Sequence, residues 1–232
     1  MVKRFYEAAA VVAAADGFTV VLDGRPARTP GGVSLILSSQ ALAQAVAKEW
    51  AAQGDIIDPG SMPLTGLANA VLDYAGSGRS VMIDGVLAYA ATDLVCYRAE
   101  EPTELVERQA RAWQPLLDWA DDTHGAGLLV TRGIVPVTQP AAAQAALRRA
   151  VEELDDIHLV AVSAAAGTTE SLVIALALVA GRIDSEEAWE AAQLDESFQR
   201  ERWGEDAEDS LRRERIKADI EAVERFTVLG RD

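Results

Sequence analysis

The sequence contains one cysteine, Cys96, and two histidines among 232 residues. One cysteine excludes an internal disulfide and every zinc motif built from several cysteines, and two histidines are too few for most other zinc sites. The sequence also lacks a G-x-S-x-G elbow, an H-E-x-x-H motif, a Walker loop and a complete G-x-G-x-x-G. We therefore predict that the chain has no metal site, no cofactor and no catalytic residue.

Basic residues are scarce, with 21 lysines and arginines against 37 acidic residues and a net charge of −16. A surface this acidic is repelled by nucleic-acid phosphates and by anionic lipid. At the N-terminus, Glu7 precedes any apolar run long enough for a signal peptide. We therefore predict a cytoplasmic protein that neither binds nucleic acid nor inserts into a membrane, and whose partners are basic proteins or cations.

Long apolar runs are also missing, and the most apolar stretch, residues 171–180, has about half of the roughly 20 residues that a membrane span needs. The run is apolar on every face, which predicts a helix buried inside a helical bundle. We expect Thr168 or Thr169 to cap its start, Glu170 to favour the positive end of its dipole, and Gly181 to terminate it.

The first third of the sequence has a β pattern followed by helical signals. Side chains alternate in character along residues 18–22, as they do in a strand. Asp16-Gly17 precedes this strand and Asp23-Gly24 follows it, and both are strong hairpin signals. Another strand is expected at 35–37. Ser39 can cap a helix that runs to Trp50 and covers one face of the sheet. Pro63 suits the first position of a further helix, up to residue 74.

After Gly76-Ser77-Gly78 the pattern is mostly helical, and we place a domain boundary there. The sequence thus predicts an α+β protein: a small N-terminal antiparallel β-sheet domain with a packed helix, residues 1–77, followed by a larger helical bundle domain, residues 78–232. Short apolar stretches at 94–97 and 128–130 could be extended. Helices are expected at 81–92, 103–122, 141–155, 157–166, 185–203 and 207–228.

Residues 184–209 carry eleven acidic residues against two arginines, which is more than half of the excess negative charge. As one helix, this segment would bring Trp189, Glu196 and Trp203 to one stripe, because they recur every seven residues. The segment is either a solvated acidic face whose tryptophans anchor it to the core, or a recognition surface for a basic, partly apolar partner. Trp50 has the same two interpretations.

Five motifs, in consistent order and spacing, resemble the assembly chaperones of the F-type ATP synthase alpha subunit, from about Arg4 to the last helix. They are EW at 49–50, MPLT at 62–65, TDLVCYRAEEP at 92–102, WQPLLDW at 113–119 and LDESFQ followed by WG at 194–204. The resemblance implies a small β-containing N-terminal domain, a larger helical domain and no catalytic activity. It also implies binding of the free, unassembled alpha subunit, which would shield the surface that later meets a beta subunit.

The same resemblance implies site residues. Asp195, Glu196, Gln199, Trp203 and Glu208 match the stretch that the family uses, and Trp50 matches a family tryptophan. A mitochondrial member of the family would carry a transit peptide, and we recognise none in this sequence. The expected protein is therefore a bacterial cytoplasmic relative that is monomeric when free. The full predicted partner-binding set is Trp50, Trp189, Asp195, Glu196, Gln199, Trp203, Asp206 and Glu208.

Two alternatives of other classes stay open from the sequence. The first is a carboxylate-dependent hydrolase whose acid and base are among Asp195, Glu196, Asp206 and Glu208, which requires a deep pocket and at least one raised carboxylate pKa. The second is a nucleotide-binding regulator, which tight ATP binding would support.

Overall fold

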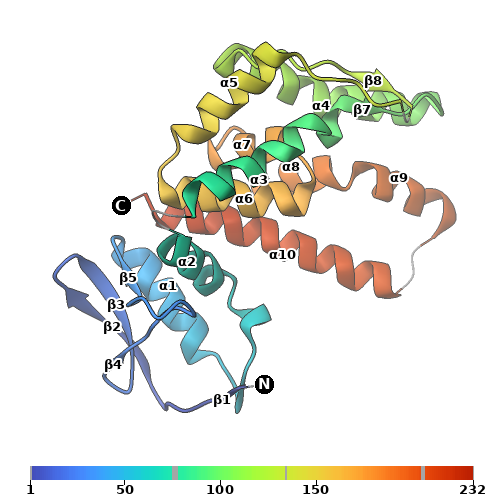
Figure 1. Ribbon diagram of the computed structural model, residues 1–232. Helices are drawn as coiled ribbons and strands as arrows, with labels where there is room; N and C mark the ends of the chain where they lie inside the picture. The colour runs from blue at the N-terminus through green and yellow to red at the C-terminus, as the bar shows by residue number, and fades with distance from the viewer. Residues whose placement is uncertain (1, 75–77, 134, 205–206, 232) are drawn as a thin grey trace. The chain divides into compact units, whose positions relative to one another are not determined.

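The computed structural model describes residues 2–74, 78–133, 135–204 and 207–231 (Figure 1). It forms two compact units, one comprising Met1–Arg79 with Arg225–Asp232, the other Ser80–Glu224. The predicted α+β class is confirmed, because small antiparallel sheets occur in the first unit and packed helices make up most of the second. None of the helices in the described ranges combines the length and apolar character needed to cross a membrane.

The sheet of the first unit is a set of short antiparallel strands around β3. Strand order is β2–β3–β4, and β5 also pairs with β3 through Phe18 and Leu37. A separate pair joins the N-terminal strand β1 to β6. The bounds are β1 Val2–Lys3, β2 Ala9–Ala14, β3 Gly17–Leu22, β4 Arg25–Pro26, β5 Ile36–Leu37 and β6 Ile56–Ile57.

Both predicted hairpins are present. Asp23 and Gly24 have φ of +48° and +77°, as a two-residue type I′ turn requires, and the Asp23 carboxylate accepts hydrogen bonds from the Glu7 and Ala8 amides. In the first hairpin, the turn is one residue earlier than the Asp-Gly signal, because Gly17 already belongs to β3. Gly17 has φ +141°, and a Cβ there would lie 2.3 Å from the Leu37 carbonyl oxygen, so the close approach of β5 requires glycine.

The first unit also contains helices α1 (Gln40–Ala51) and α2 (Pro63–Tyr74), with the 3-10 turn η1 (Pro59–Ser61) between them, and the C-terminal end of the last helix. As predicted, Ser39 caps α1, and its hydroxyl accepts from the Leu42 amide. Glu49 on α1 accepts from the amides of Leu64 and Thr65 at 2.9 and 2.8 Å, and so caps the start of α2. Two of the motifs, EW and MPLT, therefore meet in a structural contact.

The second unit is a helical assembly with one short parallel strand pair, β7 with β8. The extended segment predicted at 128–130 begins slightly later, in β8. From residue 79 onward the elements are α3 Arg79–Ala91, η2 Leu94–Cys96, β7 Tyr97–Arg98, α4 Thr103–His124, β8 Thr131–Arg132, α5 Ala141–Glu152, α6 Asp156–Thr169, α7 Leu172–Val179, α8 Ser185–Ala192, α9 Leu194–Trp203 and α10 Ala207–Leu229, of which the last residues of α10, from Arg225, belong to the first unit.

Helix α7 is the predicted apolar helix, and all eight of its residues are buried. The predicted caps Thr168 and Thr169 are wrong, because Ser171 caps the helix and Thr169 donates back to the Ala165 carbonyl. Glu170 ends α6 with φ +55° and does not begin α7. Gly181 terminates the helix as predicted, with φ +71°.

The single helix predicted over 185–203 is wrong, because the chain breaks at Gln193, where φ is −106° and ψ is 20°. The Gln193 side chain is buried, and its Oε1 accepts a hydrogen bond from Arg213 Nη1 on α10 at 3.2 Å. Arg213 lies twenty residues after Gln193 in the sequence, so the local pattern could not predict this contact. The break separates the residues of the predicted stripe onto α8 and α9.

Candidate partner-binding surface

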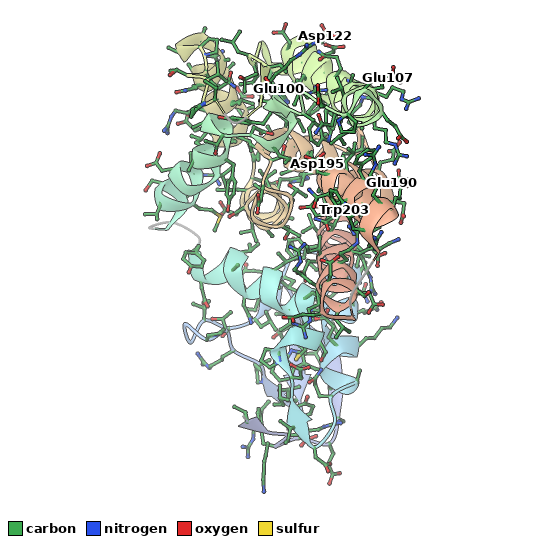
Figure 2. The ribbon with its side chains drawn as sticks, turned by 90° about the vertical axis from the view of Figure 1, so that its right-hand side faces the viewer. Glu100, Glu107, Asp122, Glu190, Asp195 and Trp203 are labelled. Carbon is green, nitrogen blue, oxygen red and sulfur yellow. The ribbon has the colours of Figure 1, made fainter. Side chains whose placement is uncertain are left out.

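Helix α9 brings four of the predicted residues together, Asp195, Glu196, Gln199 and Trp203. The Trp203 side chain is 78% exposed at the end of the helix. Gln199 is also exposed, and Glu196 is half-buried. Figure 2 shows Asp195 and Trp203 on this side of the second unit with Glu190 of α8, and Glu107 of α4 higher in the view.

The remaining predicted residues lie elsewhere. Glu208 is exposed in the first turn of α10, where acidic side chains favour the positive end of the helix dipole. Asp206 lies outside the described residues. Trp189 is on α8, and Trp50 belongs to α1 in the first unit, so the structure does not place the two tryptophans on one helix face with Trp203.

Phe198 anchors α9 to α4. Its ring is buried between two guanidinium groups, of Arg108 at 5.2 Å and Arg202 at 4.4 Å from the ring centre. Arg108 donates to the carboxylates of Glu104 and Glu201, both at 2.8 Å, and Arg202 reaches Glu104 at 3.4 Å. The exposed residues of α9 therefore stand on a helix that is fixed by aromatic and charged contacts.

Asp195 is a second anchor of α9. Its Oδ1 accepts a hydrogen bond from Gln109 Nε2 at 2.7 Å, and Gln109 Oε1 accepts from the Ala99 amide at 2.7 Å. Burial raises the pKa of the Asp195 carboxyl, and the hydrogen bond from Gln109 partly opposes that shift. A raised pKa is one requirement of the hydrolase alternative, but Asp195 does not line the cavity beside α9.

Trp189 is packed against α10 and is half-buried. The Arg213 guanidinium lies 4.8 Å from the ring centre and the Lys217 ammonium 5.0 Å, while Lys217 also forms an ion pair with Glu186. The indole nitrogen is shielded and has no hydrogen-bond partner among the described residues. These contacts make Trp189 an anchor of α8, unlike the exposed Trp203.

Trp50 lines a cavity of about 580 Å³ in the first unit. Its ring meets the ring of Tyr6 edge-on at 5.6 Å, and its carbonyl accepts from the Tyr6 hydroxyl at 2.8 Å. Phe5, which is 68% exposed, and Arg25 also line this cavity. Trp50 thus anchors α1 and at the same time forms part of an apolar wall.

Sequence reasoning missed a cavity of about 680 Å³ between α4, α8 and α9. Four arginines line it, Arg108 and Arg111 on α4, Arg182 before α8 and Arg200 on α9. They are spread over 93 positions of an acidic chain, so no local pattern joins them. The chain contains more arginine than lysine, but this bias in composition does not indicate where the arginines gather in the fold.

Within the described ranges, no group of three or more histidine, cysteine, aspartate or glutamate residues could hold a metal ion. Cys96 is buried beside Asp93, and burial raises the pKa of its thiol to about 12. At neutral pH this thiol is protonated, which disfavours a nucleophilic role.

Residues 3–121 match the family model described as ATP12 chaperone protein. The crystal structure of Atp12 from Paracoccus denitrificans, and that of an aspartate-to-lysine variant of it, are each 38% identical to this chain with a TM-score of 0.89, over 99% of this chain and 98% of theirs. Atu1473 from Agrobacterium tumefaciens is also 38% identical, with a TM-score of 0.89, over 98% of this chain and 85% of its own. The mitochondrial protein atp12 of Schizosaccharomyces pombe is 24% identical, over 87% of this chain and 74% of its length.

Proposed function

Because the chain belongs to the ATP12 chaperone family, a family of ATP synthase assembly chaperones, we propose that it binds the unassembled alpha subunit of the F-type ATP synthase. The observation that carries this proposal is the exposed Trp203 at the end of a helix that is fixed to α4. Tryptophan is among the commonest hot-spot residues of interfaces, and an exposed ring is available to a partner.

The proposed contact consists of Trp203, Glu196, Gln199 and Glu208. Their carboxylates and amide suit a basic, partly apolar surface of the client, and Trp203 would supply the apolar anchor. Asp195 and Trp189 would act as positioning residues, because their side chains are held in internal contacts. A helix that is already fixed loses little conformational entropy on binding, which favours affinity.

Trp50 is proposed as a contact in the first unit. The cavity that it lines has apolar walls from Phe5 and Leu22 and a rim that includes Arg25. An apolar side chain of the client would fit such walls. Client affinity of variants substituted separately at the Trp50 cavity and on α9 tests whether one client molecule engages both.

Holding a client requires no chemistry. Binding lowers the concentration of free alpha subunit and covers apolar surface that would otherwise aggregate. A beta subunit that competes for the same surface would release the chaperone without nucleotide hydrolysis. We therefore propose that the chain is not an enzyme and acts as a monomer, in the bacterial cytoplasm, since the Paracoccus and Agrobacterium relatives are bacterial.

Light scattering of isolated alpha subunit at its aggregation temperature tests this proposal. We expect an equimolar amount of the chain to suppress scattering, and an equal mass of serum albumin not to do so. Equal scattering with and without the chain would contradict the proposed function. Isothermal calorimetry with ATP tests the nucleotide-binding alternative, and we expect no heat of binding.

A further inference from the structure

The cavity between α4, α8 and α9 differs in charge from the rest of the molecule. The chain carries a net charge of −16, yet four arginines line this cavity against three glutamates, Glu187, Glu190 and Glu201. Glu190 lies on α8 on the side shown in Figure 2. The lining therefore carries one more positive than negative charge, in contrast to the chain as a whole.

Two of the three glutamates are already engaged. Glu187 Oε2 accepts from the Asp184 amide at 3.0 Å, in the capping box of α8. Glu201 pairs with Arg108 at 2.8 Å. Arg111 and Arg182 are exposed, and their side chains make no hydrogen bond or ion pair within the described ranges. Arg111 and Arg182 are therefore two guanidinium groups of the cavity lining that are available to a ligand, beside the exposed carboxylate of Glu190.

Apolar side chains form the wall behind these arginines. Leu116 and Ala191 are buried, and Leu194 and the ring edge of Trp189 are half-buried. A simple anion such as phosphate would satisfy the arginines but would leave this wall uncovered. A ligand with a carboxylate next to an aliphatic side chain would satisfy both.

We propose that this cavity binds an acidic, partly apolar peptide segment of the client, with its carboxylates on Arg111 and Arg182. The proposal rests on the proposed function, because the ligand that it names is a segment of the client. It gives the second unit two adjoining surfaces, one around Trp203, Glu196 and Gln199 for basic or apolar client residues and the cavity for acidic ones. Such a pair of surfaces would fix the orientation of the client.

Fluorescence anisotropy with two labelled, end-blocked hexapeptides tests the cavity directly. One peptide alternates leucine with glutamate, and the other alternates leucine with lysine. We expect the acidic peptide to bind the full chain and the basic peptide to bind at least about tenfold more weakly at this site, because one arginine–carboxylate hydrogen bond contributes about a factor of ten.

The decisive variant is Arg111→Gln with Arg182→Gln. It should weaken the acidic peptide about tenfold or more, and leave the thermal midpoint unchanged because both side chains are exposed. The matched control is Arg132→Gln with Arg215→Gln, which removes the same charge at exposed positions outside the cavity. Equal loss in both double variants, or no loss in either, would overturn the proposal.

Binding of the alpha subunit itself distinguishes failure of the cavity proposal from failure of the proposed function. If the wild-type chain binds it and the Arg111→Gln, Arg182→Gln variant binds it equally well, the cavity proposal is wrong and the proposed function stands. If the wild-type chain does not bind it, the proposed function is wrong, and the peptide measurement alone decides whether the cavity takes acidic segments.

Discussion

Gln109 Nε2 on α4 donates a hydrogen bond to Asp195 Oδ1 on α9, over a distance of 2.7 Å. Because Gln109 Oε1 also accepts from the Ala99 amide, Gln109 connects two of the sequence motifs by which the family is recognised, at 92–102 and 194–204. The pair also shows that an acidic residue of the predicted partner-binding set is turned towards the protein interior. The contact positions α9, and the exposed side chains farther along that helix are the ones available to a partner.

Substitution of Asp195 separates its charge from its hydrogen bond. Asp195→Asn keeps an oxygen that can accept from Gln109 and removes a charge that burial disfavours, so we expect stability at neutral pH to be equal or higher. Client affinity should stay within about twofold. Asp195→Ala should cost about 1–3 kcal/mol, because it leaves Gln109 Nε2 without its acceptor. Urea unfolding and client titration of both variants measure these effects, and a large affinity loss in Asp195→Asn would make the carboxylate a direct contact.

The two tryptophans of the acidic segment should behave differently when truncated. Trp203→Ala should weaken client binding by about 2 kcal/mol and change stability by less than about 0.5 kcal/mol, because the ring is 78% exposed. Trp189→Ala should lower the free energy of unfolding by about 2 kcal/mol, because the ring packs under Arg213 and Lys217. Thermal denaturation and client titration of both variants distinguish an interface residue from an anchor. The reverse pattern would show that the client binds at α8.

Much of the fold was predictable from the sequence because its signals are local. Asp23-Gly24 specifies a tight turn through backbone conformation, Ser39 caps α1 through its own hydroxyl, and Pro63 starts α2. The eight buried residues of α7 were predicted from their uniform apolar character. Each of these features depends on residues within a few positions of one another.

The parts that were wrong or missed depend on distant contacts. The cap of α7 is Ser171 because Asp93, 78 residues earlier, fixes its hydroxyl at 2.5 Å and accepts from the Val173 amide at 3.0 Å. The break at Gln193 depends on Arg213. The motif residues Glu49 and Asp93, together with Gln109, connect elements that are distant in the sequence.

Asp93 gives the second unit a specific pH dependence. Burial raises its pKa to about 6, above the ordinary value of about 3.9 that the unfolded chain would have. Between these values the folded state holds a proton that the unfolded state has lost, so the Asp93 contribution to the free energy of unfolding falls by about 3 kcal/mol as pH rises from about 4 to about 6.

Comparison with Asp93→Asn isolates this effect, because asparagine does not titrate. We expect the variant to be less stable than the wild type at pH 4, where Val173 loses its acceptor, and the difference to narrow as pH rises. Urea unfolding at several pH values measures it. A stability difference that does not change with pH would contradict the shifted pKa.

A charge at the centre of α7 should unfold the helical unit. Ile174 is fully buried, so Ile174→Asp places an unpaired carboxylate in the core and should cost more than about 4 kcal/mol. Val81→Asp is the matched control, because Val81 is 73% exposed on α3 and the same change there should cost little. Circular dichroism and proteolysis report the outcome. A folded Ile174→Asp protein that no longer binds the client would show that α7 contacts the partner itself.

Size-exclusion chromatography with isolated alpha subunit tests the central claim most directly. The wild-type chain should co-elute with the subunit, and Glu196→Lys with Glu208→Lys should abolish co-elution. The thermal midpoint should stay within a few degrees, because these side chains have no ion-pair partner among the described residues and each loses only its interaction with a helix dipole, about 0.3–1 kcal/mol. The control is Glu107→Lys with Asp122→Lys on α4, which changes charge equally at positions outside the proposed contact residues. Absence of co-elution by the wild type, or co-elution retained by the α9 variant, would contradict the account.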